Sequence, residues 1–312
     1  MSVPPAFEAM IHDIRMDLEW PLHDPATAKE GAQIWRDLPY AVIPGFRPLM
    51  LDITVPAGQG PFPLVIFIHG GAWMNGHPTI SSITYRKLDL FNRLKEAGFA
   101  VARITYRLSS EAKFPAQLYD ARAALRYLRQ NAQIFGVDGT RFAVMGDSAG
   151  GHVACLVGFT GNQQSLPGEE NPDQISSSVA AIVNWFAPVN FLTMAEQMID
   201  KDWPSTNDPN SPESRLIGGA VQENKELAMA ASPVSYIHPE IPPVLIQHGD
   251  LDRLVPFAQA EELAGKLRSV GVSCQLFCIN GADHCFWGVD GKPVVDALAF
   301  LTKTIGKGSR PR

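Results

Sequence analysis

The sequence predicts an α/β protein in which helices cover both faces of a mostly parallel sheet. Short apolar runs alternate along the chain with longer segments of helical period, and this alternation is typical of parallel strands joined by helices. The 312 residues, 46% of them hydrophobic, are enough to bury one large core. We therefore expect residues 1–312 to form a single domain.

Seven apolar runs carry the strand prediction. They lie near residues 49–55, 63–68, 99–105, 141–146, 180–186, 243–248 and 273–279. Among the segments between them, residues 116–129 place Leu118, Ala121, Leu125 and Leu128 on one stripe of a helix. This segment fits a crossover helix, and we expect its arginines to lie on a solvated face.

A serine between glycines follows the fourth of these runs. The letters GDSAG, from Gly146 to Gly150, separate the apolar run from a helix-compatible segment at residues 151–159. A sharp turn that lifts the Ser148 hydroxyl clear of the sheet requires unusual backbone angles, and side chains at the flanking positions would collide. The pattern therefore predicts a nucleophile elbow with Ser148 as the nucleophile.

Glycines also follow the second apolar run. The letters HGGAW begin at His69, and glycines just past a strand let backbone N–H groups point into a site with no side chain in the way. We predict an oxyanion hole that uses the N–H group of Gly71 and that of Gly70 or Ala72. The N–H group of Ala149, directly after the nucleophile, completes it. We interpret His69 itself as a structural hydrogen-bonding residue.

Two aspartates, Asp250 and Asp252, follow the apolar run at residues 243–247. A carboxylate on this loop can orient a histidine and stabilise its charged form. We assign this role to Asp252, because an aspartate beside a glycine, as Asp250 is, commonly bonds its own turn. His284 follows the last apolar run and is the predicted general base.

Together the motifs HGGAW, GDSAGG, HGDLDRLVP and GADH resemble the α/β-hydrolase superfamily, and within it the bacterial carboxylesterases of the hormone-sensitive-lipase-like and feruloyl-esterase-like groups. The similarity covers roughly residues 45–305. It departs at Ala72, where many lipase-like members have a third glycine. The resemblance implies the α/β-hydrolase fold with a mostly parallel eight-stranded sheet. It also implies the order nucleophile, acid, base, which Ser148, Asp252 and His284 follow.

Two regions fit the alternation of strands and helices badly. Residues 1–45 contain Trp20, Trp35 and many prolines, and residues 190–236 combine methionines and Trp203 with a loop-forming stretch. In related hydrolases such segments form a cap over the nucleophile, and we predict that both regions contribute to one here. A long surface excursion is the alternative.

Composition excludes several classes of partner. The net charge of −6 and the lack of a lysine or arginine tract argue against a nucleic-acid partner. The sequence has no apolar stretch of eighteen residues, so we expect no membrane span. The first residues lack a basic region followed by an apolar stretch, which favours a cytoplasmic location without a secretory signal. Assembly into a homo-oligomer stays open.

The cysteines and histidines do not suggest a cofactor. The four cysteines are too few and too unevenly placed for a disulfide framework, and we expect Cys155 to be a small buried apolar residue. The sequence has no HExxH, CxxC or phosphate-loop glycine pattern. We therefore expect neither a metal nor an organic cofactor.

Aromatic residues next to the motifs suggest an apolar substrate pocket. We predict that Trp73, Trp185 and Phe286 line it. For Phe186 and Trp287, a place in the core is the preferred interpretation.

The predicted function is that of a serine carboxylesterase, which hydrolyses small short-chain or aryl esters through an acyl-enzyme. The alternative is an arylformamidase or amidase, because HGGAW also resembles the HGG-x-W motif of kynurenine formamidases. A catalytically silent binding protein with the same fold is a third hypothesis. The presence of Ser148, Asp252 and His284 together argues against it.

Overall fold

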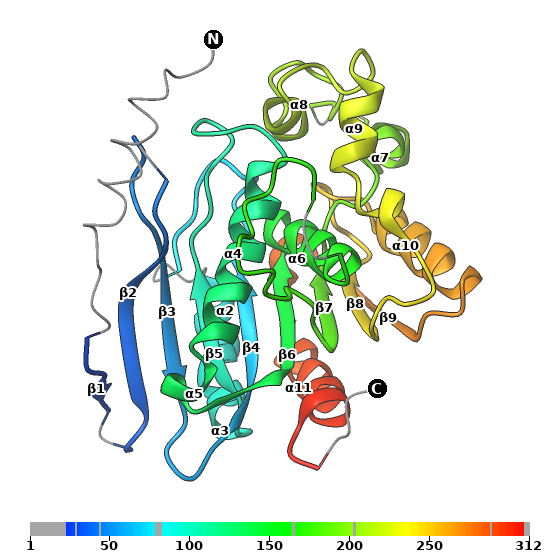
Figure 1. Ribbon diagram of the computed structural model, residues 1–312. Coiled ribbons are helices and arrows are strands. Elements are labelled where there is room, and N and C mark those ends of the chain that lie inside the picture. Colours follow the sequence, from blue (N-terminus) through cyan, green and yellow to red (C-terminus); the bar gives the residue numbers. More distant parts are fainter. Residues whose placement is uncertain are drawn as a thin grey trace, which may run out of the picture.

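The computed structural model describes residues 23–308, apart from residues 29, 44, 79–82, 164–165, 202–203 and 288. Over these residues nine strands form one sheet, in the order β1-β2-β3-β5-β4-β6-β7-β8-β9 (Figure 1). The strands are β1 (Ala26–Thr27), β2 (Gln33–Ala41), β3 (Leu49–Val55), β4 (Phe62–Ile68), β5 (Ala100–Ile104), β6 (Val137–Asp147), β7 (Ala181–Trp185), β8 (Val244–Gly249) and β9 (Cys274–Ile279). From β5 across to β9 all neighbours pair in parallel, whereas β1, β2, β3 and β5 pair antiparallel with one another.

Helices cover both faces of this sheet, as the sequence predicts. Side chains of α4, α6 and α10 belong to one buried cluster, and those of α2, α3 and α11 belong to the other. The helices are α2 (Ile83–Leu88), α3 (Leu90–Glu96), α4 (Ala116–Gln130), α5 (Ala132–Phe135), α6 (Ala149–Thr160), α7 (Phe191–Gln197), α8 (Pro212–Ile217), α9 (Lys225–Ala231), α10 (Phe257–Ser269) and α11 (Lys292–Ile305), with short 3-10 turns η1 (Pro233–Tyr236) and η2 (His284–Phe286).

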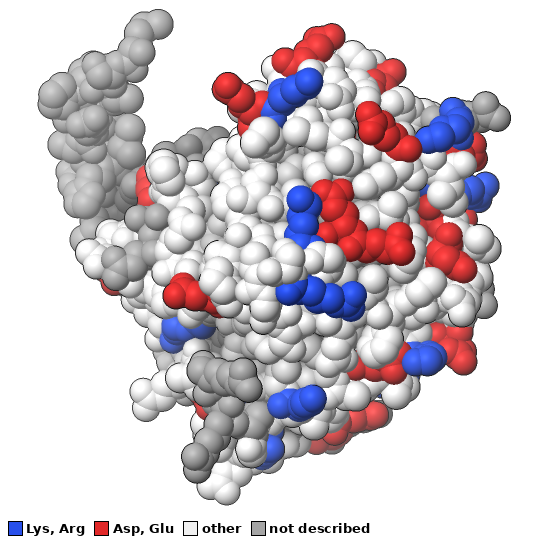
Figure 2. All heavy atoms as spheres, turned by 90° about the vertical axis from the view of Figure 1, so that its right-hand side faces the viewer, with Lys and Arg blue, Asp and Glu red and all other residues white. Residues whose placement is uncertain are grey.

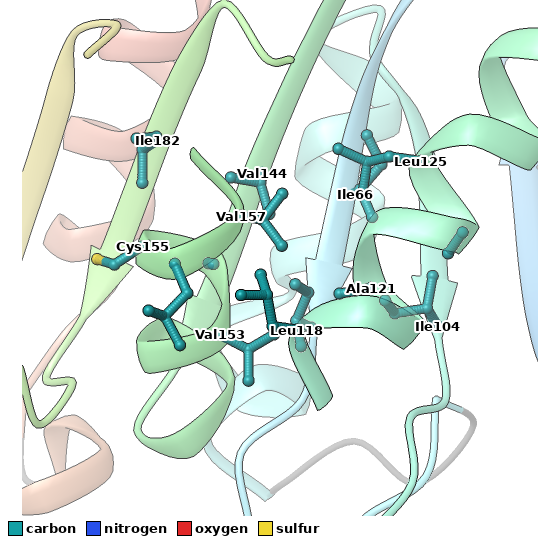
Figure 3. Packing of buried hydrophobic residues seen from close by; sticks show 14 of the residues in the cluster. Ile66, Ile104, Leu118, Ala121, Leu125, Val144, Val153, Cys155, Val157 and Ile182 are labelled. Atoms are coloured by element: carbon teal, nitrogen blue, oxygen red, sulfur yellow. The ribbon is translucent and has the colours of Figure 1, made fainter. Parts of the chain in front are cut away.

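The central strand β4 shows why the chain needs two apolar layers. All its residues are buried, and successive side chains point to opposite faces of a strand. Ile66 therefore contributes to the cluster under α4 and α6, while Val65 and Phe67 contribute to the cluster under α2, α3 and α11. Figure 3 shows Leu125 of α4 and Val157 of α6 beside the sheet residues of the first cluster. The strand is a continuous apolar run because neither of its faces reaches solvent.

The structure confirms each of the predicted strand runs, and it adds two at the edge that the sequence did not reveal. Residues 33–41 form β2, so this part of the region 1–45 belongs to the sheet and is not a cap segment. Trp35 is buried there with its ring centroid 5.2 Å from that of Phe135. The sheet consequently has nine strands in the described residues, not eight. Residues 1–22, including Trp20, lie outside the described residues.

The prediction that the arginines of α4 lie on a solvated face was wrong for two of them. Arg122 is fully buried and Arg126 nearly so, and both are paired with the carboxylate of Glu169. Arg122 also donates to the carbonyl oxygens of Thr160 and Gln163. A buried guanidinium is tolerated here because its donors are satisfied. Cys155 is buried, as expected.

The segment 190–236 forms a group of short helices beside α10, at the upper right of Figure 1. Two α10 side chains anchor its start. Gln259 Oε1 accepts from the backbone N–H groups of Val189 and Asn190, each at 2.8 Å, and Glu262 accepts from the side-chain amide of Asn190 at 2.6 Å.

On the face shown in Figure 2, acidic and basic side chains are interspersed. Within the described part of the chain, none of the helices combines the length and apolar character needed to cross a membrane.

Candidate active site

The turn between β6 and α6 holds Ser148 in an unusual conformation. Its backbone lies at φ 51° and ψ −123°, a region that residues with a side chain rarely occupy. The glycines around it have a steric reason: a Cβ on Gly146 would lie 2.4 Å from the carbonyl of Gly150, and a Cβ on Gly150 would lie 2.1 Å from the carbonyl oxygen of Ile68. Three backbone segments therefore meet at this turn with no room for side chains between them.

The structure brings Ser148, His284 and Asp252 into one hydrogen-bonded line. His284 Nε2 lies 3.0 Å from Ser148 Oγ, and His284 Nδ1 lies 2.7 Å from Asp252 Oδ2. Each residue lies at or just past the carboxyl end of a parallel strand: Ser148 after β6, Asp252 after β8 and His284 after β9. Parallel strands end at the same edge of the sheet, which is why residues so far apart in sequence meet here.

Asp252 is held as a carboxylate by its neighbours. Its Oδ1 accepts from the backbone N–H groups of Leu254 and Val255, each at 2.9 Å, and His248 Nε2 lies 3.2 Å from its Oδ2. Burial by itself would raise the pKa of Asp252, but the hydrogen bonds from His248 and His284 hold it well below its usual value. Asp252 thus remains charged next to the imidazole of His284. Sequence reasoning did not identify His248 as part of this arrangement.

The neighbouring aspartate, Asp250, joins two loops. Its Oδ1 accepts from the backbone N–H of Gly281 at 2.7 Å, and Leu251 N–H donates to the carbonyl of Ala282 at 3.0 Å. We expected Asp250 to bond its own turn. Instead, it accepts a hydrogen bond from the loop that carries His284. The choice of Asp252 as the partner of His284 agrees with the geometry.

The loop after β4 narrows the choice of oxyanion-hole donors. The Gly70 N–H donates to Asp147 Oδ1 at 2.9 Å, so it is not available to a substrate and our inclusion of Gly70 is corrected. Gly71 has φ 111°, and a Cβ there would lie 2.3 Å from the carbonyl oxygen of Asn75. Ala72 and Ala149 line the same cavity as Ser148.

His69 has the structural role that the sequence suggested. Its Nδ1 donates to the carbonyl of Gly70 at 2.8 Å, and its ring stacks on Tyr106 with the centroids 4.5 Å apart. The Tyr106 hydroxyl in turn donates to the His69 carbonyl at 2.9 Å. These contacts fix the start of the glycine loop.

Asp147 is a site residue that sequence reasoning missed. It directly precedes Ser148, is buried, and holds the Gly70 N–H, so it links the elbow to the glycine loop. Burial raises the pKa of Asp147 to about 6. Its place inside the GDSAG run was the available signal.

A cavity of about 500 Å³ opens beside Ser148 and His284. Its lining includes residues of the 204–213 stretch together with Ala72, Trp73, Pro188, Leu254 and Val255. Trp73 lines the cavity as predicted, and its Nε1 is directed at His152 Nδ1, 3.2 Å away.

Two of the predicted pocket residues are in the core instead. Trp185 is fully buried and donates from Nε1 to Gln247 Oε1 at 2.7 Å, while Phe286 packs edge-on against it with the ring centroids 5.3 Å apart. Both belong to the cluster on the α2, α3 and α11 face. Phe186 is buried as predicted, but Trp287 is 52% exposed, so the expectation that it lies in the core was wrong.

Glu213 is the most unusual group in the cavity wall. Its side chain lies at the second position of α8, the residue is only 5% exposed, and its Oε2 has no hydrogen-bond partner. Burial raises the pKa of Glu213 to about 7. A buried acceptor without a partner costs about 1–3 kcal/mol.

In the described residues, no group of three or more histidine, cysteine or acidic side chains is arranged to hold a metal ion.

Gly150→Ala should destabilise the protein by about 3 kcal/mol or more, because the new methyl group would overlap a backbone carbonyl that cannot move independently. Gly265→Ala in α10 is the matched control. A Cβ there meets nothing within 4 Å, so this change should raise stability by about 0.5–1 kcal/mol. Urea unfolding of both variants tests this, and equal effects would contradict the steric argument.

Glu213→Gln should become stabilising as the pH rises. The folded chain binds a proton at Glu213 up to about pH 7, whereas the unfolded chain loses it near 4.5. Relative to the glutamine variant, the wild-type protein should therefore lose stability between these values, by up to about 3 kcal/mol at high pH. Urea unfolding from pH 4 to pH 9 measures the difference. The exposed Glu226, changed to glutamine, is the control. A difference that stays constant over this range would rule out the raised pKa.

Comparison with known proteins identifies the family of this chain. The BD-FAE family model matches residues 51–267. Among curated proteins, esterase LipQ of Mycobacterium tuberculosis is 31% identical over 85% of this chain and 60% of its own length. The isoprenylcysteine α-carbonyl methylesterase ICME of Arabidopsis thaliana is 25% identical over 81% of this chain and 56% of its own. The chain thus spans about 60% or less of the length of these relatives.

Solved structures show the same architecture. A truncated carbohydrate esterase from gut microbiota matches 91% of this chain and 100% of its own, with a TM-score of 0.77 and 28% identity. The propionate-bound esterase Est2 of Thermogutta terrifontis matches 90% of this chain and 97% of its own, with a TM-score of 0.68 and 25% identity. With a sheet of this topology and a family match over most of its length, the chain belongs to the BD-FAE family and has the α/β-hydrolase fold.

Proposed function

We propose that the protein is a serine carboxylesterase that hydrolyses short-chain or aryl carboxylic esters. The observation that carries the proposal is the hydrogen-bonded line from Ser148 through His284 to Asp252, which opens onto a cavity large enough for a small ester. The names of the relatives support it, since both LipQ and ICME are named as esterases.

Each side chain has a defined task in this mechanism. A serine hydroxyl is a weak nucleophile at neutral pH, so His284 Nε2 takes the proton of Ser148 Oγ as the oxygen attacks the ester carbonyl. Asp252 accepts from His284 Nδ1, keeps the imidazole in the useful tautomer and stabilises the imidazolium that forms. His284 then protonates the departing alkoxide. Water, deprotonated by the same imidazole, hydrolyses the acyl-enzyme and restores Ser148.

Backbone N–H groups stabilise the negative charge of the tetrahedral intermediate. Ala149 is the first residue of α6, and the N–H groups of the first helical turn have no partner inside the helix. We assign the other donors to Gly71 and Ala72, because the Gly70 N–H is bonded to Asp147. Each such donor contributes on the order of 10²- to 10³-fold to the rate.

We propose that the site takes small acyl groups. It is bounded on one side by the segment 190–236, which we propose acts as the cap of the site and limits the length of the bound chain. Structures of Thermogutta terrifontis Est2 are described with propionate and with butyrate bound, and another as phosphonylated by sarin. These descriptions support short acyl groups and a reactive serine for this chain as well.

Ser148→Ala should reduce turnover of an aryl acetate by about 10⁶-fold, because the nucleophile is lost while the fold is unchanged. Steady-state rates, with intact-mass detection of a phosphonate adduct on the wild-type protein, measure both aspects. Near-normal turnover by the variant would contradict the role of Ser148. N-formylkynurenine is assayed in parallel, and rapid deformylation without ester hydrolysis would favour the arylformamidase alternative.

Asp252→Asn and Asp250→Asn should differ sharply although both replace an aspartate on the same loop. Asparagine at position 252 cannot hold the His284 tautomer in the same way, and a loss of about 10⁴-fold in kcat is expected. Asparagine at position 250 retains an acceptor for the Gly281 N–H, so its kcat should stay within about tenfold. A larger loss at position 250 would show that the acid has been assigned to the wrong residue.

A further inference from the structure

Two residues that line the cavity of the proposed nucleophile each carry a buried polar atom without a hydrogen-bond partner. Glu213 Oε2 and Thr206 Oγ1 are both buried without a hydrogen-bond partner, and both residues line the cavity that contains Ser148 and His284. Glu213 is 5% exposed and Thr206 is 7% exposed. Buried polar groups in folded proteins are nearly always paired, so two orphans in one cavity wall require an explanation.

The Ser211 hydroxyl interacts with the Glu213 carboxyl group and lowers its pKa, but Oε2 of Glu213 has no hydrogen-bond partner, and the polar groups nearby are used in other bonds. Ser211 Oγ donates to the carbonyl of Thr206 at 2.8 Å and accepts from the Ser214 N–H at 3.1 Å, as the cap of α8. Asp208 Oδ1 accepts from the Asn210 N–H at 2.7 Å. The stretch 204–213 is therefore internally bonded and still leaves one carboxylate oxygen and one hydroxyl unused.

The pair selects a particular kind of ligand group. A carboxylate oxygen accepts hydrogen bonds, and a threonine hydroxyl can donate one, so the complementary neutral group is one that both donates and accepts. An alcohol hydroxyl does both. Among the described residues, the cavity lining contains Asp208 and Glu213 but no lysine or arginine. Burial raises the pKa of Glu213 to about 7, and a neutral hydroxyl can pair with either protonation state of the carboxyl group.

We propose that Glu213 and Thr206 form a hydroxyl-binding subsite, and that the esters this protein prefers carry a hydroxyl group apart from the ester itself. The substrate hydroxyl donates to Glu213 Oε2 and accepts from Thr206 Oγ1. The inference rests on the proposed esterase function and gives its substrate class. Glu213 and Thr206 act in specificity, while the bond-breaking steps remain with Ser148 and His284.

The test compares esters that differ by a single group. One series varies the acyl part, with 4-nitrophenyl butyrate and 4-nitrophenyl 3-hydroxybutyrate, and the other varies the alcohol part, with propyl butyrate and glycerol 1-butyrate. The wild-type kcat/KM should favour the hydroxylated member of at least one series by about tenfold or more. In Glu213→Leu and in Thr206→Val, which is nearly isosteric, the ratio should fall towards one.

The use of a ratio removes general losses of activity, and Thr206→Val keeps the test valid if Glu213→Leu does not fold. Asp208→Asn is the matched control: it removes another carboxylate from the cavity wall and should keep the ratio. A wild-type ratio near one, or a ratio unchanged in Thr206→Val and Glu213→Leu, would overturn the subsite. A stronger preference for an ammonium group in place of the hydroxyl would overturn it as well.

Binding to the Ser148→Ala variant separates this inference from the proposed function. NMR titration with the same ester pairs needs no turnover. If wild-type protein hydrolyses none of the esters, the esterase proposal fails. Tighter binding of the hydroxylated member, lost in Thr206→Val, would even then support the subsite, and equal binding of both members would overturn it.

Discussion

The site depends on backbone packing at the point where β6 turns into α6. Gly146 and Gly150 have no side chains, and the turn therefore approaches the end of β4 so closely that even a methyl group on Gly150 would overlap the carbonyl of Ile68. This contact places the glycine loop after β4 directly beside the start of α6. As a result, Ser148, the N–H groups of the glycine loop and the N-terminus of a helix share one small volume.

Hydrogen bonds between loops then fix the polar groups within this volume. Asp147 bonds Gly70, which ties the elbow to the glycine loop, and Asp250 bonds Gly281, which ties the loop of Asp252 to that of His284. Asp147 directly precedes Ser148, and Asp250 lies two residues before Asp252. Each of the two bonds is therefore formed close to a proposed catalytic residue. Each loop is thus held by its neighbour, which is the kind of support a precise nucleophile-to-base distance requires.

The success and failure of the sequence predictions follow from physical differences between segments. Strands buried on both faces read as continuous apolar runs, so the central sheet could be predicted. Strand β2, which lies next to the edge strand β1, could not, because Asp37 lies at φ 52° and the pairing with β3 is interrupted by register shifts, which destroy regular alternation. The prediction for Trp185 rested on its closeness in sequence to the motifs. Its side chain points to the same face of β7 as that of Val183, two residues earlier, and therefore lies in the buried cluster under α2, α3 and α11.

The proposed catalytic residues could be predicted because each of them follows a strand, and the ends of parallel strands meet at one edge of the sheet. Glu213 and Thr206 have no such marker, since their segment has neither a motif nor a regular period, and the absence of a hydrogen-bond partner is a property of three-dimensional packing only. The two sets are also fixed by different constraints. The proposed catalytic residues are positioned by the sheet, whereas residues 204–213 of the cavity wall belong to a segment attached to α10 through Gln259 and Glu262. Because residues 204–213 are not part of the sheet, a change at Glu213 or Thr206 leaves the strand ends that carry the proposed catalytic residues in place, so the proposed substrate preference can diverge while the proposed reaction is kept.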